Sequence, residues 1–188
     1  MSTRERILTA MAELMRRQGY GVTTVKQVSE LAHAPMGSLY HHFPQGKQQI
    51  AAEALRAAGA AYIRLLPLLL DPHEDVRAAV SAAFTEAAEQ MERAGWINMC
   101  PVVTIAGEIA DSEPALREVT AEVIDSWVRE CTDYFTRRGL DAPEARRLGF
   151  ALLSTLEGAF ILSRTLRSTE PLRAAGQSLA FRLAGDRV

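Results

Sequence analysis

The chain has 188 residues, of which 48% are hydrophobic and 6% aromatic, and 21 Lys and Arg stand against 23 Asp and Glu. This length suits one domain or a small head on a larger body, with ample chain for a buried core. Ala and Leu, both strong helix formers, dominate the apolar residues. The longest apolar run, around Leu65 to Leu70, is too short for a membrane span and is broken by Pro67.

The start of the chain, MSTRERILTA, is polar and then amphipathic, and it lacks the apolar core of a signal peptide. We therefore expect a cytoplasmic protein with no membrane partner. Cys100 and Cys131 have no metal-ligand spacing, and in a reducing compartment they are most simply two thiols.

Capping signals and apolar stripes at helical spacing predict an all-α fold of about nine helices, and no segment alternates long enough to form a strand. The expected helices cover about 2–18, 24–32, 36–43, 47–66, 72–94, 101–110, 112–138, 141–166 and 169–185. The fourth is too long to belong only to a head, so we expect it to link the head mechanically to the body.

The stretch from Thr23 to Lys47 predicts two short helices across a tight turn. Thr24 and Gln27 form a capping box, and Pro35 ends the first helix and opens the second. Leu39 and Phe43 can face inward, while Ser38, Tyr40, His41 and His42 can present hydrogen-bonding groups outward. A short polar-faced helix braced by another is the helix-turn-helix arrangement, which reads a DNA major groove.

Charge supports this interpretation. Residues 1–50 hold six Lys and Arg against three Asp and Glu, whereas residues 51–188 hold fifteen against twenty. The two lysines of the chain, Lys26 and Lys47, both lie in the basic part. A basic head on an acidic body fits a protein that touches phosphate at one end. The alternative is an ordinary solvated helix face.

The sequence GSLYHHF, preceded by TTVKQVSELA and followed by a lysine, resembles the DNA-binding head of the tetracycline-repressor-type (TetR) family of bacterial regulators. The combination of APMGSLYHHFPQGKQQI with the later MCPVVTIAGEIAD is similar to its LmrA/YxaF-like subgroup, which includes regulators of flavonoid-responsive and multidrug-resistance genes. The resemblance implies an N-terminal helix-turn-helix domain (1–47) and an effector-binding and dimerisation domain (48–188), with helix 4 from about residue 46 joining them.

The expected DNA contacts combine both lines of argument. Thr24 presents a hydroxyl and free backbone N–H groups to a phosphate, Lys26 and Lys47 supply charge, and the outer face of the second short helix supplies hydrogen bonds. By resemblance, Tyr40, His42 and Lys47 clamp the DNA backbone. The same resemblance places Met36, Gly37, Ser38 and His41 where the family reads bases.

Three features depart from the family pattern. His33 stands at a turn position that is usually glycine, and histidine is among the residues enriched at positive φ. Met36 replaces a commonly polar residue, so a thymine-methyl contact can replace a hydrogen bond. Lys47 lies four residues after Phe43, one more than is common, with Gly46 as the apparent insertion.

Two stripes near the C-terminus suggest a twofold interface made from two helices of each chain. These stripes consist of Ala151, Thr155, Ala159 and Ser163 on one helix and Leu172, Gly176, Leu179 and Leu183 on the next. The alternative is that both stripes pack within the chain. A two-headed DNA reader needs a dimer and the family resemblance agrees, so we expect a homodimer.

The body is also expected to hold a largely apolar cavity with a few polar groups, the usual form of a small-molecule site. The candidate ligand-binding residues are Tyr62, Phe84, Trp96, Met99, Cys100, Thr104, Glu108, Trp127, Cys131, Leu153, Ser154 and Glu157. The irregular stretch from Trp96 to Thr104 is the favoured part. The alternatives are that these aromatics form ordinary core, and that Glu108 or Glu157 simply pairs with an arginine such as Arg164.

No cofactor or metal is expected, since His41 and His42 diverge on a helix and no paired-carboxylate or phosphate-loop motif is present. The sequence predicts a homodimeric, ligand-responsive repressor, not an enzyme, which binds a palindromic DNA operator until a small apolar or aromatic effector enters the body. The alternatives are a DNA-binding regulator controlled by a protein partner and, more remotely, a helical-bundle enzyme.

Overall fold

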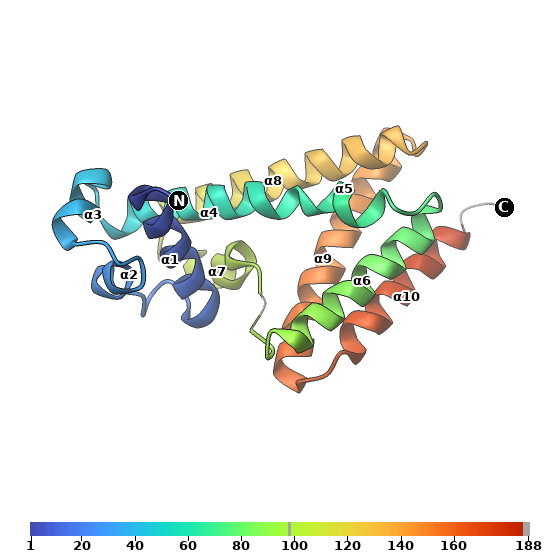
Figure 1. The fold of residues 1–188 in the computed structure, drawn as a ribbon. Coiled ribbons are helices and arrows are strands. Elements are labelled where there is room, and N and C mark those ends of the chain that lie inside the picture. The colour runs from blue at the N-terminus through green and yellow to red at the C-terminus, as the bar shows by residue number, and fades with distance from the viewer. Residues whose placement is uncertain (98, 186–188) are drawn as a thin grey trace. The chain divides into compact units, whose positions relative to one another are not determined.

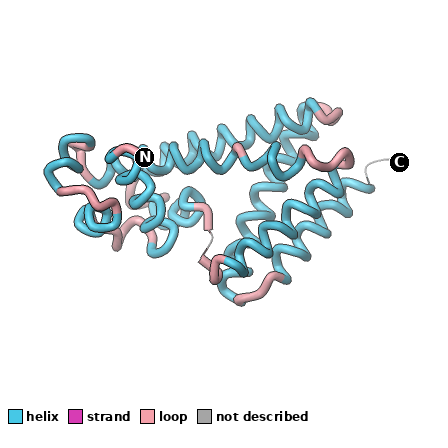
Figure 2. Tube along the Cα trace, viewed as in Figure 1, coloured by secondary structure: helices cyan, strands magenta, loops and turns pink. Residues whose placement is uncertain are grey.

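The computed structural model describes residues 1–97 and 99–185, and in these ranges its regular structure consists of helices (Figure 2). The all-α prediction is confirmed. Ten helices are described, which Figure 1 shows in chain order. They are α1 (Thr3–Gln18), α2 (Val25–Leu31), α3 (Met36–His42), α4 (Lys47–Ile63), α5 (Leu65–Leu70), α6 (Val76–Arg93), α7 (Pro101–Ile109), α8 (Pro114–Arg137), α9 (Ala142–Leu166) and α10 (Glu170–Gly185).

Contacts divide the chain into two compact units. The first consists of Met1–Ala61 and Met99–Asp125, and the second of the described residues in 62–98 and 126–188. The segment that holds α7 therefore groups with the N-terminal helices, although it is distant from them in sequence. Helices α4 and α8 each contribute residues to both units.

The first unit is built around α1. Ser2 and Glu5 form the predicted capping box, and Gly19 ends the helix at φ 88° with its N–H donating to the Met15 carbonyl. Ile7 and Met11 are fully buried on the inner face of α1, and the helix contacts α2, α3 and α7. A single buried stripe on α1 thus supports both short helices and α7.

The second unit is held together by α6 and α10, which lie side by side (Figure 1), and by α9, which contacts both. A Cβ atom on Gly176 of α10 would stand 2.5 Å from the Phe84 Cβ atom of α6, so only glycine permits this approach. Phe84 is 1% exposed as a result. Burying an aromatic side chain of this size stabilises the fold by about 2 kcal/mol.

The region between α4 and α6 differs from its prediction. A helix was expected to begin at Asp71-Pro72, but α6 begins at Val76 with Asp75 as its cap. The leucine run forms a separate helix, α5, because Pro67 falls in its first turn, where a missing N–H costs nothing. Asp71 ends α5 and accepts a hydrogen bond from the Tyr134 hydroxyl at 2.8 Å, so its carboxylate does not cap α6.

The stripes predicted for the dimer lie largely inside the second unit, as their alternative interpretation held. The residues that are buried there are Ala159, Ser163, Leu172, Gly176 and Leu179. Ala151, Thr155 and Leu183 are half-buried. The small residues of α9 and α10 therefore serve packing within one chain.

Candidate functional site

Helix α3 presents the polar surface that the sequence predicts. Leu39 and Phe43 are fully buried and anchor the helix, which turns the other side chains outward. Met36, Gly37, Tyr40 and His41 are exposed, and Ser38 and His42 are half-buried. This is a surface of hydrogen-bonding groups with one apolar side chain, Met36, which is 40% exposed.

The turn before α3 is fixed by side chains from two helices. Arg6 of α1 donates from Nε to the Ala32 carbonyl at 3.0 Å, and the Ser29 hydroxyl donates to the Ala34 carbonyl at 2.5 Å. His33 adopts φ 48°, the positive value anticipated at this position. These bonds hold α2 and α3 as one unit, since helices of seven residues are not stable alone.

The start of α2 carries the predicted capping box, in which the Thr24 N–H also donates to the Gln27 side-chain oxygen at 2.8 Å, and its phosphate contact stays a prediction. Thr24 caps the helix, with the Gln27 N–H donating to its hydroxyl at 3.2 Å. Thr24 and Lys26 are both exposed, and the Lys26 ammonium lies 3.9 Å from the Glu30 carboxylate. A helix start with a hydroxyl and a nearby cation favours an anion.

Lys47 opens α4 and contacts the turn between α1 and α2. Its Nζ donates to the Gly21 carbonyl at 3.3 Å and lies 4.0 Å from the centre of the Tyr20 ring. Burial lowers the pKa of Lys47, while the carboxylates of Glu113 and Glu108 act to raise it. Gly46 precedes Lys47 and adopts φ 68°. The additional residue noted in the sequence thus forms a turn that directs Lys47 toward the segment between α1 and α2.

Glu108 of α7 meets the same turn. Its carboxylate accepts hydrogen bonds from the Tyr20 N–H at 2.9 Å and the Gly21 N–H at 2.6 Å. Glu108 was expected to bind a ligand or pair with an arginine. The structure instead places it against the backbone of the helical head.

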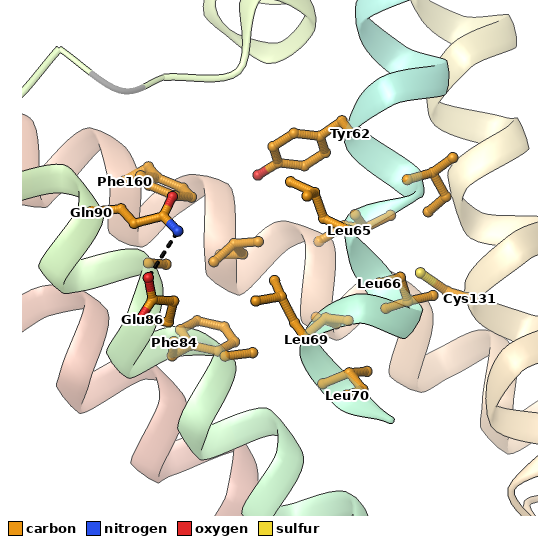
Figure 3. Close-up of a pocket in the computed structure, with 16 residues that line it drawn as sticks. Tyr62, Leu65, Leu66, Leu69, Leu70, Phe84, Glu86, Gln90, Cys131 and Phe160 are labelled. Carbon is orange, nitrogen blue, oxygen red and sulfur yellow. Dashed lines mark hydrogen bonds between the residues drawn. The ribbon is translucent and has the colours of Figure 1, made fainter. Parts of the chain in front are cut away.

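The second unit contains a cavity of about 160 Å³, shown in Figure 3. A volume near 150 Å³ accommodates about one aromatic ring. Apolar side chains from α4, α5, α6 and α9 form most of its wall. They are Ile63, Leu65, Leu66, Leu69, Leu70, Ala83, Phe84, Ala87, Leu152, Leu153, Leu156 and Phe160.

Four other side chains complete the wall: Tyr62, Glu86, Gln90 and Cys131. Gln90 donates to the Glu86 carboxylate at 2.9 Å, as Figure 3 shows, and that carboxylate also pairs with Arg93 at 2.8 Å. Burial raises the pKa of the Cys131 thiol to about 12, so it is protonated at neutral pH and acts as a small apolar group. The described lining includes no Lys, Arg or His.

The cavity brings together part of the predicted ligand set. Tyr62, Phe84, Cys131 and Leu153 line it. The described lining does not include the other candidates, which are Trp96, Met99, Cys100, Thr104, Glu108, Trp127, Ser154 and Glu157. Of these, Met99, Cys100, Thr104 and Glu108 belong to the first unit, and Ser154 faces outward.

The sequence interpretation missed the leucines of α5, which form one side of the cavity in Figure 3. The available signal was the run LLPLLL at Leu65 to Leu70, but the preceding helix was expected to end near Leu66 and no separate helix was expected before residue 72. Trp127, although outside the lining, supports it, because its ring centre lies 5.2 Å from that of Tyr62.

Glu157 is buried in α9, with 5% of its surface exposed. Burial raises the pKa of its carboxyl group to about 7, an effect that the Tyr62 hydroxyl only partly offsets. The carboxyl group is therefore partly protonated near neutral pH. Within the described residues, no three His, Cys, Asp or Glu side chains gather as metal ligands, and no helix of that part is long and apolar enough to cross a membrane.

Two protein-family models match the chain. The family model of bacterial regulatory proteins, tetR family, matches residues 7–54. The model of the transcriptional regulator LmrA/YxaF-like C-terminal domain matches residues 76–178. The helix-turn-helix thus falls in the first match, and both Glu108 and most of the cavity wall fall in the second.

Individual relatives cover nearly the whole chain. The uncharacterized HTH-type transcriptional regulator YxaF of Bacillus subtilis is 33% identical over 170 residues, covering 90% of this chain and 89% of the relative. The HTH-type transcriptional regulator LmrA of the same species is 29% identical and covers 90% of each chain. A solved structure of a regulatory protein TetR from Rhodobacter sphaeroides shares the fold, with a TM-score of 0.80 and 22% identity over 94% of this chain and 96% of that one.

The buried carboxyl group of Glu157 predicts how stability depends on pH. The pKa of this carboxyl group is about 7 in the folded protein and 4.5 in the unfolded chain, so folding favours its protonated form. Its stabilising contribution to the free energy of unfolding is therefore fully present below pH 4.5 and is lost as pH rises through 7. At pH 8, Glu157→Gln should therefore be more stable than the original chain, by up to about 3 kcal/mol. At pH 4 the difference should vanish or reverse. Urea denaturation at both pH values measures it, and a difference that does not depend on pH would contradict the assignment.

Proposed function

Because the chain belongs to the TetR family of DNA-binding bacterial transcriptional regulators, we propose that it is a homodimeric repressor released from a palindromic operator by a small effector. In this proposal, residues 1–47 bind DNA, and residues 48–188 bind the effector and form the dimer. Residues 99–125 have a further part in it, since they pack with the DNA-binding helices.

The apolar cavity of the second unit is the observation that carries the effector proposal. Its wall is mostly Leu, Ala and Phe, and its described lining has no cationic group. An anionic ligand would lose its hydration without gaining a partner, which costs several kcal/mol. A cationic ligand is also disfavoured, because the Glu86 carboxylate of the lining already pairs with Arg93. The proposed effector is therefore a small, uncharged and largely apolar molecule of about one aromatic ring, with Gln90 and Tyr62 available for hydrogen bonds.

Helix α4 connects this cavity with the DNA-binding head. Lys47, its first residue, contacts the turn after α1, while Ile63, its last, lines the cavity. An effector that favours a different orientation of α4 alters the separation of the two heads. Release then depends on the effector's differential affinity for the two states, because phosphate and base contacts both require correct register.

A second surface of α9 supports the dimer. Phe150, Ile161, Leu162 and Leu166 are between 46% and 65% exposed, although they are large and apolar. Their spacing places them on one side of the helix. Gly158 lies among them, and a Cβ atom there would meet nothing within 4 Å. An apolar stripe with a central glycine allows close approach by the same helix of a second chain, which makes it the proposed twofold interface.

The effector proposal predicts that filling the cavity abolishes binding. Ala87 lines the cavity and Ala78 lies exposed on the same helix, so Ala87→Leu and Ala78→Leu form a matched pair. Thermal shifts with a panel of single-ring aromatic alcohols, their carboxylate analogues and their ammonium analogues should show stabilisation by the alcohols alone. Ala87→Leu should lose that shift and Ala78→Leu should keep it. If no compound stabilises the original chain, control by a protein partner becomes the better account.

The DNA-binding proposal predicts different effects of Tyr40 and Met36. Tyr40→Phe removes a hydroxyl assigned to the DNA backbone, so affinity should fall about fivefold on every sequence. Met36→Gln exchanges an apolar group for an amide at a base-reading position, so it should change the preferred base at one position. Selection from a randomised duplex pool measures both. A change of base preference caused by Tyr40→Phe would contradict its assignment.

The dimer proposal predicts that a charge on the exposed stripe produces monomers. Leu162→Arg places an unpaired charge at the centre of the proposed interface, whereas Ala78→Arg adds the same charge to an exposed position of α6. Sedimentation velocity should show a monomer for the first variant and a dimer for the second. Helical content by circular dichroism checks that both remain folded, and a Leu162→Arg dimer would contradict this choice of interface.

A further inference from the structure

Helix α7 contacts the DNA-binding head through one carboxylate. Glu108 lies near the end of α7 and spans the Tyr20 and Gly21 amides, with distances of 2.9 Å and 2.6 Å to its two oxygens. Hydrogen bonds from N–H groups to a charged acceptor are stronger than neutral ones. Because two adjacent amides are bound at once, the turn between α1 and α2 is held in direction as well as position.

The turn has room for this carboxylate because of its glycines. A Cβ atom on Gly19 would stand 2.5 Å from Glu108 Oε2, and one on Gly21 would stand 2.9 Å from Oε1. Gly19 needs its φ of 88° to end α1. Gly21 is not among the residues with positive φ, so a methyl group there would chiefly displace the Glu108 carboxylate and would not strain the backbone.

The same turn holds Lys47. The Gly21 carbonyl accepts from Lys47 Nζ at 3.3 Å, and the Tyr20 ring lies beneath the ammonium group at 4.0 Å. Glu108 therefore binds the two amides of a turn whose carbonyl and ring locate Lys47. A displaced turn would remove the carbonyl and the ring that hold the Lys47 ammonium group.

Charge repulsion alone would give Glu108 the opposite effect, that of weakening DNA binding. A carboxylate close to a DNA-binding lysine repels phosphate, so its removal should strengthen DNA binding. Glu113 provides the comparison, because it also acts on the pKa of Lys47, and within the described residues its carboxylate accepts from the Gln48 side chain at 3.3 Å and not from the turn. Whether removal of the Glu108 carboxylate strengthens or weakens DNA binding therefore distinguishes charge repulsion from positioning.

We propose that Glu108, a residue outside the helix-turn-helix, is a positioning residue for DNA binding, which seats the turn between α1 and α2 and through it Lys47. The contact also joins α7 directly to the turn between α1 and α2.

The first experiment compares variants that remove equal charge. Glu108→Gln and Glu113→Gln each remove one negative charge, and Glu108→Ala removes both hydrogen bonds. Affinity is measured for a duplex selected from a random pool by the original protein. Glu108→Ala should bind about tenfold more weakly, Glu108→Gln should be intermediate, and Glu113→Gln should bind as well as the original chain or better. Stronger binding by both glutamine variants would overturn the proposal in favour of simple repulsion.

The second experiment is a double-mutant cycle that separates positioning from loss of folding. Gly21→Ala should displace the carboxylate and weaken DNA binding in the original chain, yet have little further effect in the Glu108→Ala background. Hydrogen exchange of the Tyr20 and Gly21 amides should accelerate in both single variants while the α1 core stays protected. Additive losses of affinity, or faster exchange throughout α1, would show a general structural defect and overturn the proposal.

Discussion

A helix of seven residues is not stable in water alone, so the position of α3 depends on the side chains that anchor it. Leu39 and Phe43 supply that anchor, and both are fully buried. Arg6 and Ser29 fix the preceding turn by hydrogen bonds to the Ala32 and Ala34 carbonyls. The exposed side chains of α3 are thus placed by contacts on the opposite side of the helix, so a change in the packing of the head would alter their positions.

Much of this local structure could be predicted from sequence because its causes are local. The caps at Ser2, Thr24 and Asp141 depend on residues three apart, and each is present. The prediction for the α5 region was wrong for a nonlocal reason, because the Asp71 carboxylate accepts a hydrogen bond from the Tyr134 hydroxyl, 63 residues away. Glu108 is a similar case, because the backbone amides that it accepts from lie 88 and 87 residues earlier. No spacing rule identifies a carboxylate that caps a turn belonging to another part of the chain.

Periodicity identified faces of helices but not what covers them. The stripe of Ala159 and Ser163 and the stripe of Leu172 and Gly176 are real, yet both are buried within the chain. The cavity shows the same limit: Tyr62, Phe84, Cys131 and Leu153 were expected and line it. The α5 leucines were missed, because an apolar run has the same appearance in a core, an interface and a ligand pocket.

The weak charge of the head bears on the release mechanism proposed for this regulator. Residues 1–50 carry only six Lys and Arg against three Asp and Glu, and Lys47 lies near two carboxylates. Few phosphates can be neutralised, so binding that does not depend on sequence is weak, and its dependence on salt is shallow. Affinity must then come from hydrogen bonds and contacts that require register. A head held by such contacts loses most of its affinity after a small displacement, since little long-range attraction retains it. In the proposed mechanism, a modest shift of α4 is therefore sufficient for release.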